Sequence, residues 1–151
     1  MIRQAALGRA RLWILGVLLC LSCAAGAAQR IDDVVLVAGR SSPVTEISES
    51  DLRRVFVGVA PRSAPRDTRA VFNATDPDTI AVFLRSCLFM TSFHYERLLL
   101  TRRYSDGQRP VTRADSYAEV ARRLRSDNRL LSFIPRRRLG DFEDLKEVPM
   151  K

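Results

Sequence analysis

Three groups of side chains in this sequence could do chemistry. Cys87 and His94 stand seven residues apart, and a cysteine beside a histidine can form a thiolate nucleophile with its base. The acids between Asp141 and Asp144 supply the oxygen ligands that divalent cations prefer. The run Arg136–Arg138 offers positive charge to an anion or to an acidic partner. The helices, strands and loops that position these residues decide whether they have such chemical roles or are ordinary core and surface residues.

Plainer roles fit the cysteine, the histidine and the acids better. Cys87 follows the helical spacing of Ile80, Phe83 and Leu84, which predicts a buried and unreactive thiol. His94 has no neighbours at a metal-ligand spacing. The acids lack a glycine-bounded loop of regular ligands and are expected to form a solvated turn. We therefore expect no catalytic residue, no metal and no cofactor, and a protein that is not an enzyme.

Residues 1–28 have the pattern of a secretory signal peptide. Basic residues come first, an apolar run from Leu12 to Leu21 follows, and small residues from Ala24 to Ala28 provide a cleavage site before Ala28 or one residue later. Two alternatives remain at this stage, an uncleaved anchor helix and a lipoprotein modified at Cys23. The expected location is periplasmic or secreted, with membrane contact only through an uncleaved leader.

The rest of the chain, residues 29–151, is the right length for one domain. The whole chain has 151 residues, 46% of them hydrophobic and 28% charged, which is ordinary globular composition. Loss of the leader would remove Cys20 and Cys23, so that Cys87 could form no intrachain disulfide.

Arginine carries most of the positive charge. The net charge is +8 for the whole chain and +5 without the leader, and 12 arginines lie between Arg97 and Arg138. Such a segment could face nucleic acid, an anionic membrane or an acidic partner. Most of these side chains are expected on solvated helix faces. No aromatic residues interleave with them as a stacking surface for bases would require, so nucleic acid is not an expected partner.

Short apolar strands alternate with amphipathic helices in residues 29–151. Strands are predicted at 31–37, 69–73, 130–134 and 145–148. Helices are predicted at 48–58, from Asp76, from Thr91 or Ser92, and from Ser116. Residues 60–65 and 104–113 are expected to be loops. This order predicts an α/β fold, a small mixed sheet flanked by helices.

The predicted helices each have an apolar face. Ser48 is the expected cap of the first helix, Gly58 its left-handed stop, and Ser116 with Glu119 a capping box. The inward residues are expected to be Leu52, Val55 and Phe56; then Tyr95, Leu98 and Leu99; then Tyr117, Val120, Ala121 and Leu124.

The order of these motifs resembles the phosphate-type periplasmic substrate-binding proteins, and more closely their small, single-lobe secreted relatives. The family's Ile-Phe-Leu-Gly is similar to the segment 55–58, which reads Val-Phe-Val-Gly. Its Gly-Ala-Ile-Gly-Tyr corresponds to the segment 129–133, and its Phe-Thr-Gly followed by proline to 104–107 and Pro110. The resemblance covers most of residues 31–148 and implies a single lobe of the type II periplasmic-binding-protein fold.

The phosphate slot departs from the family pattern. A Ser-Gly-Thr at a helix start holds phosphate in full-length members, and the matching residues here are Pro77, Asp78 and Thr79. The proline removes one N–H donor, and Asp76 and Asp78 place carboxylates where the anion would sit. About 120 residues also leave no room for a second lobe of ordinary domain size, ~100 to 150 residues.

These observations predict a secreted, non-enzymatic, solute-binding-like accessory domain with a degenerate site for phosphate or another anion. Its candidate ligand-binding residues are Thr79, Arg136, Arg137 and Arg138. The alternative is a protein-interaction or assembly module of the cell envelope that has lost ligand binding. The expected partners are a small anion and an envelope or inner-membrane protein.

Overall fold

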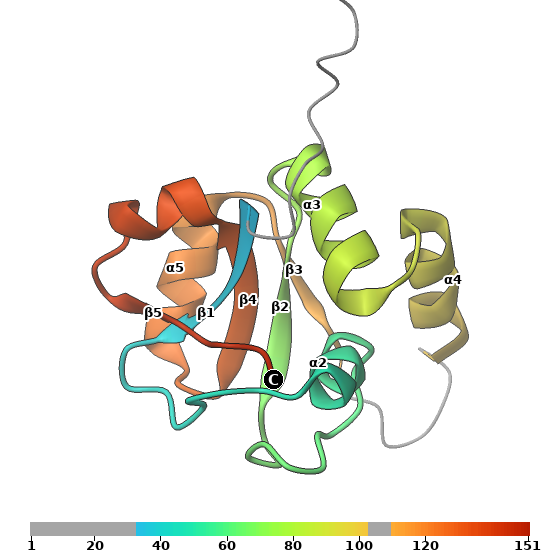
Figure 1. Ribbon diagram of the computed structural model, residues 1–151, viewed down its shortest axis with the longest axis horizontal. Coiled ribbons are helices and arrows are strands. Elements are labelled where there is room, and N and C mark those ends of the chain that lie inside the picture. Colours follow the sequence, from blue (N-terminus) through green and yellow to red (C-terminus); the bar gives the residue numbers. More distant parts are fainter. Residues whose placement is uncertain (1–32, 103–109) are drawn as a thin grey trace, which may run out of the picture.

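A computed structural model describes residues 33–102 and 110–151, and its centre is a five-stranded sheet in the order β3-β2-β4-β1-β5 (Figure 1). The predicted signal peptide, residues 1–28, lies outside the described residues. The strands are β1 (Val34–Gly39), β2 (Arg69–Asn73), β3 (Thr112–Ala114), β4 (Leu130–Pro135) and β5 (Leu145–Glu147).

The sheet is mixed, as the sequence predicts. β2 is parallel to β4, with Arg69 opposite Leu130, and parallel to β3 on its other side. β1 runs antiparallel to β4, with Val35 opposite Ile134, and antiparallel to β5. The carboxyl ends of β2, β3 and β4 therefore lie at one edge of the sheet, where α/β folds place their ligands.

Helices cover both faces of the sheet. One face holds α2 (Glu49–Phe56), α3 (Pro77–Phe83), which continues into a π-helical turn (Leu84–Leu88), and α4 (Ser92–Arg102). The other face holds α5 (Tyr117–Ser126). The α/β class with a small mixed sheet between helices is thus confirmed.

Alternation along the strands creates two cores. Val35 and Val37 of β1 pack with α5, whereas Leu36 and Ala38, which alternate with them, pack with the other helices. The larger core contains a cluster of rings, of which Phe83 and Phe133 stack at a centroid distance of 3.8 Å. Because the central strands β1 and β4 are buried on both faces, their sequences are almost continuously apolar.

Most local signals act as the sequence predicts. Ser48 accepts the N–H of Asp51 at 3.2 Å and caps α2, and Gly58 has the left-handed φ of 79°. The cap of α5 is Ser116, which accepts the N–H of Glu119 at 3.2 Å. The Glu119 carboxylate accepts the N–H of Asp115, one residue before the cap, so the capping box is displaced by one residue.

Two predictions need correction. The predicted loop at 104–113 gives way to strand β3 at Thr112–Ala114; residues 103–109 are not described. This strand is short and half polar, and only its parallel pairing with β2 identifies it. The predicted first strand at 31–37 is found at Val34–Gly39, although residues 31 and 32 are not described. The predicted stripe of Ile80, Phe83, Leu84 and Cys87 does face the larger core, with Ile80 half-buried.

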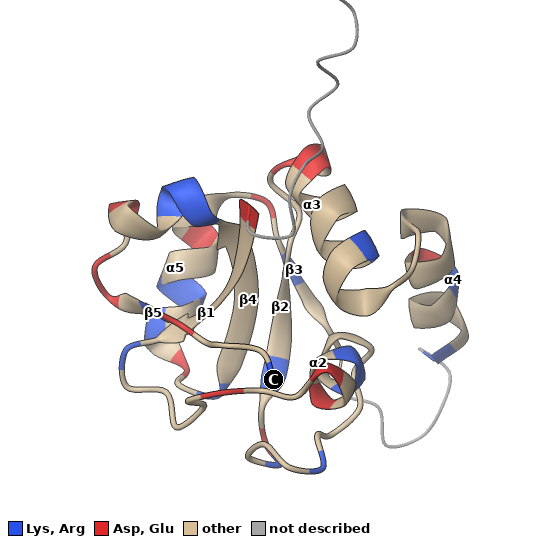
Figure 2. Ribbon diagram, viewed as in Figure 1, with Lys and Arg blue, Asp and Glu red and all other residues tan. Residues whose placement is uncertain are grey.

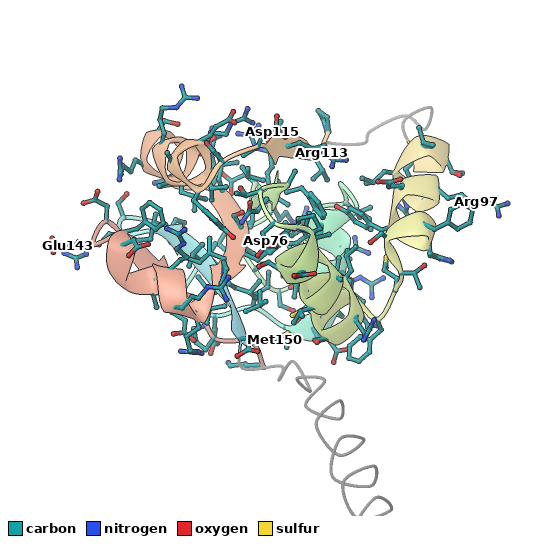
Figure 3. All side chains as sticks on the ribbon, turned by 90° about the horizontal axis from the view of Figure 1, so that it is seen from above. Asp76, Arg97, Arg113, Asp115, Glu143 and Met150 are labelled. Atoms are coloured by element: carbon teal, nitrogen blue, oxygen red, sulfur yellow. The ribbon has the colours of Figure 1, made fainter. Side chains whose placement is uncertain are left out.

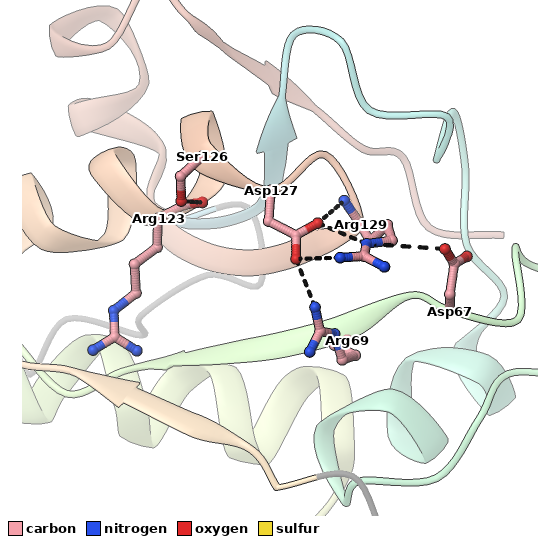
Figure 4. Close-up of polar contacts among 6 residues, drawn as sticks. All are labelled: Asp67, Arg69, Arg123, Ser126, Asp127 and Arg129. Carbon is pink, nitrogen blue, oxygen red and sulfur yellow. Dashed lines mark hydrogen bonds and ion pairs between the residues drawn. The ribbon is translucent and has the colours of Figure 1, made fainter.

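An ion-pair cluster joins the starts of β2 and β4 at the other edge of the sheet (Figure 4). Asp127 accepts a hydrogen bond from the Arg69 guanidinium at 2.6 Å and from Nε of Arg129 at 2.9 Å. The Arg129 side chain, followed by its backbone N–H, lowers the pKa of Asp127 to about 2. These contacts fix the register of the two parallel strands.

Candidate functional site

The candidate site is a hollow of about 90 Å³ at the carboxyl ends of β2 and β4. α3 begins just after β2, and the arginine turn, a 3-10 helix at Arg136–Asp141, begins just after β4. Parallel pairing of the two strands brings these two connections together. The hollow is lined by Asp33, Val34, Asp76, Asp78, Thr79, Val82, Pro135 and Arg137.

The Asp76 carboxylate accepts hydrogen bonds from the donor groups at the start of α3, beside this hollow. It accepts the hydroxyl of Thr79 at 2.6 Å and the backbone N–H of Asp78 at 3.1 Å. The Thr79 hydroxyl first, and then the backbone N–H groups and Arg137, lower the pKa of Asp76. The ionised Asp76 carboxylate therefore already offsets the positive end of the α3 helix dipole.

The three predicted arginines point to different partners. Arg137 lies 3.8 Å from the Asp76 carboxylate and lines the hollow, although its side chain is 77% exposed. Arg136 forms a two-bond ion pair with Glu147, at 2.8 and 3.1 Å. Arg138 pairs with Asp141. The structure thus brings Thr79 and Arg137 together and leaves the other two arginines engaged elsewhere.

The charge of the hollow is unfavourable for an anion. Asp33, Asp76 and Asp78 line it, and Arg137 is its one basic residue. Figure 2 shows the acidic start of α3 and the basic arginine turn at the same end of the molecule. Within residues 33–102 and 110–151, no three His, Cys, Asp or Glu side chains are grouped to hold a metal ion. The donors at the start of α3 are bonded to the Asp76 carboxylate, which leaves the exposed Arg137 as the donor side chain that lines the hollow.

The cysteine and histidine do not form a reactive pair. Cys87 is 7% exposed, and burial, aided by the negative charge of Glu49, raises the pKa of its thiol to about 11. The thiol is therefore protonated at neutral pH, which removes its nucleophilic form. His94 lies on the exposed side of α4.

The acids at 141–144 lie at the surface. Asp141 pairs with Arg138, and Asp144 pairs with Arg125 at 2.9 Å. Glu143 is exposed. They form the solvated turn that the sequence predicts.

A second feature was missed in the sequence. The outer side of α4 exposes Phe93 and Leu100, at 75% and 59%, and the turn before the helix exposes Phe89 at 63%. Phe93 and Leu100 are seven residues apart, two helical turns, and the inward residues Tyr95 and Leu99 fall between them. That spacing gives α4 apolar residues on two sides, and this pattern in the sequence could have indicated the exposed apolar surface.

Among the described residues, no helix is both long and apolar enough to cross a bilayer.

Comparison with known proteins finds matches in structure only. No family model and no curated protein matches the sequence. An ABC-type phosphate transport receptor from Vibrio cholerae is 12% identical with a TM-score of 0.48, covering 78% of this chain and 46% of that one. A putative phosphate ABC transporter substrate-binding protein from Clostridium perfringens, with bound phosphate, is 9% identical with a TM-score of 0.47, covering 78% and 44%.

A possible phosphate binding protein from Planctomyces limnophilus is 10% identical with a TM-score of 0.47, and the match covers 79% of this chain and 41% of that one. The chain therefore spans less than half the length of each of these three proteins.

Proposed function

We propose that this chain is an exported, non-enzymatic domain of the solute-binding type whose anion site is filled by its own Asp76, and that it acts by contacting another protein of the envelope. The observation that carries this is the position of the Asp76 carboxylate. It accepts the Thr79 hydroxyl and the N–H of Asp78, two donors that an incoming phosphate oxygen would need.

Electrostatics supports the same conclusion. A phosphate beside Asp76 would place like charges at about 4 Å, and each such pair repels by about 1 kcal/mol in bulk water and about 4 kcal/mol near a protein surface. Protonation of Asp76 would relieve this repulsion. The lowered pKa of Asp76 makes that protonation unfavourable at neutral pH, because the Thr79 hydroxyl and the N–H groups favour the ionised form.

Anion binding is the second candidate, and one observation favours it. Thr79 and Arg137 come from separate elements and still line the same hollow, an arrangement that suits a phosphate group. Capture would require the Asp76 side chain to leave the hollow.

Thermal unfolding with added phosphate or sulfate separates the two candidates. We expect 10 mM phosphate to leave the Tm of the native chain unchanged relative to chloride at equal ionic strength. A site with a Kd of 0.1 mM would instead stabilise the fold by about 2.7 kcal/mol and raise the Tm by several degrees. Such a rise, lost in Thr79→Ala, would contradict the proposal.

The variant Asp76→Asn tests directly whether the charge of Asp76 excludes phosphate. Asparagine is also a good helix cap, so this variant should fold while lacking the charge. We expect phosphate to stabilise Asp76→Asn more than the native chain. Asp141→Asn, which removes an exposed aspartate of the arginine turn, is the matched control and should respond like the native chain.

A further inference from the structure

The exposed apolar residues of this protein gather in one place. Of the four large apolar side chains that the described residues leave exposed, three are Phe89, Phe93 and Leu100, all on α4 or in the turn before it. We call the surface formed by these three residues and Arg97 the α4 face. α4 lies at one end of the molecule in both views (Figure 1 and Figure 3). Single exposed apolar residues are ordinary, whereas a contiguous group marks a contact surface.

Helical spacing places the members of the α4 face side by side. Phe93, Arg97 and Leu100 are at positions i, i+4 and i+7 of the same helix. In Figure 3 the Arg97 side chain points away from the body of the protein. The opposite side of α4 is used by the core, where Tyr95 is 2% exposed and donates its hydroxyl to the carbonyl of Phe56. The described residues 33–102 and 110–151 therefore leave the outer side of this helix uncovered.

The turn before α4 holds Phe89 in an unfavourable conformation. Its φ is 56°, the only positive φ of a non-glycine residue in the part of the chain that the structure describes. A bulky side chain in the left-handed region is strained, and such strain concentrates at functional sites. The π-helical turn Leu84–Leu88 comes directly before it, another irregularity that is frequent at such sites. The Arg53 guanidinium lies 4.7 Å from the centre of the Phe89 ring and supports it from α2.

A groove adjoins the α4 face. Its volume is about 460 Å³, and it lies between the outer side of α3 and the turn that contains Phe89. Its lining is mostly apolar with one charged residue, and consists of Ala81, Leu84, Arg85, Phe89, Met90, Thr91 and Ser92. This volume is that of a pocket able to take one or two large side chains.

The surface is basic as well as apolar. Arg85 lies in the groove and Arg97 on the α4 face, and neither makes an ion pair with any described carboxylate. Arg53 is paired with Glu49, and Glu96 is the acidic residue nearest to Arg97 in the sequence. Two arginines that no carboxylate of the described residues pairs with, lying beside exposed rings, favour an acidic occupant.

We propose that the α4 face and its groove bind an acidic, amphipathic helix of a partner protein. The partner's apolar side chains would enter the groove and cover Phe93 and Leu100, and its carboxylates would pair with Arg85 and Arg97. This proposal rests on the protein-interaction role proposed above, and it specifies the surface that is used and the chemistry of the partner.

Two other occupants fit less well. A second copy that met the α4 face through its own α4 face would bring Arg85 and Arg97 against the same two arginines. An anionic membrane would contact the protruding rings but would leave the concave groove unfilled. Aromatic residues, methionine and arginine are also the types enriched at the centres of protein interfaces, and this surface has all three.

The test uses the full chain and a phage library of random 16-residue peptides as the probe. We expect selected peptides to carry apolar residues at helical spacing among Asp and Glu. Synthetic peptides from this selection should bind the Phe93→Ser, Leu100→Ser double variant and the Arg97→Glu variant at least tenfold more weakly than the native chain. The matched control is Arg40→Glu, the same charge change at an exposed residue after β1.

Far-ultraviolet circular dichroism establishes that the variants are folded, and each replaced side chain is exposed, so folding should persist. The proposal is overturned if selection yields no binders, if the binders lack acidic residues, or if binding is unchanged in the α4-face variants. Phosphatidylglycerol vesicles that bind the native chain and not the variants would assign the surface to a membrane instead. Sedimentation showing self-association through the same residues would assign it to a second copy.

Failure of this proposal differs from failure of the proposed function. Phosphate stabilisation of the native chain would contradict the filled anion site whatever the peptides do. Absence of acidic peptide binding with no phosphate response would contradict the α4 surface alone.

Discussion

Replacing Asp51 with asparagine should lower the free energy of unfolding by about 2 kcal/mol, more than an acidic residue at a helix start ordinarily contributes. Asp51 is fully buried at 0% exposure although it belongs to the first turn of α2. Its carboxylate accepts three backbone N–H groups from the following loop: that of Arg62 at 2.7 Å, Ser63 at 2.8 Å and Ala64 at 3.0 Å. Asp51 thus fastens residues 62–64 of the loop between α2 and β2 to the helix, while Arg54 of the same helix donates from Nε to the carbonyl of Ala60 at 2.8 Å.

The magnitude follows from these hydrogen bonds. Bonds to a charged group contribute about 1.5 to 3 kcal/mol each, against about 1 kcal/mol for neutral ones. Asparagine has one acceptor oxygen, so it can keep the bonds to Ser63 and Ala64 in weakened form, while its NH₂ group faces the N–H of Arg62. Water can reach Arg62 and relieves part of the loss. The net effect, about 2 kcal/mol, corresponds to a Tm lower by roughly 6 to 12 °C in a domain of this size.

The assay is urea unfolding followed by circular dichroism. Glu49→Gln is the matched control, because Glu49 is also acidic and in the first turn of α2 but is 42% exposed and paired only with Arg53. This control should cost no more than about 0.5 kcal/mol. Equal losses in the two variants would refute the reasoning, since they would mean that Asp51 acts only on the helix dipole.

The pH dependence gives a second readout for Asp51. Burial opposes its ionisation, but the N–H groups of Arg62, Ala64 and Ser63, together with Arg54, outweigh burial and lower the pKa below 3.8. A lowered pKa in the folded state means that the contribution is present above pH 3.8 and is lost as the pH falls through the folded pKa. Asp51→Asn should lack this part of the acid sensitivity.

Three further predictions test other contacts. Asp127→Asn should lower stability by about 1 to 2 kcal/mol at pH 7, and since the pKa of Asp127 falls to about 2 in the fold, equilibrium unfolding between pH 4 and pH 2 should show a smaller loss of stability in the variant than in the native chain. Tyr95→Phe removes the 2.7 Å hydrogen bond to the carbonyl of Phe56 and should lower the free energy of unfolding, measured by thermal unfolding, by about 1 to 2 kcal/mol. An unchanged free energy of unfolding would mean that water replaces the hydroxyl, and would contradict this prediction. Alkylation of Cys87, followed by peptide mass spectrometry at pH 8, should occur at least tenfold faster in denaturant than in buffer, because burial holds the thiol protonated with a pKa of about 11; equal rates would mean that the thiol is accessible in the native state.

Local sequence signals were sufficient for most of the elements. The strand at Arg69–Asn73 and the caps Ser48 and Asp76 were predictable, because the groups that make them lie within a few residues of one another. The strand Thr112–Ala114 was not predictable, since three partly polar residues become a strand only through pairing with β2. The candidate site was likewise predictable only where its residues are close in the sequence. Thr79 and its neighbouring carboxylates could be seen in the sequence, whereas the sorting of three adjacent arginines among three partners could not.

The sequence by itself determined the alternation of strands and helices, the apolar faces that build both cores, and the carboxylates at the start of α3. Tertiary structure alone decided that the buried Asp51 binds the backbone of a loop, and that Arg137 and not Arg136 reaches the hollow. The physical reason is the range of the interactions. Caps and periodicity act over one helical turn, whereas burial and pairing depend on what chain segments distant in sequence bring into contact.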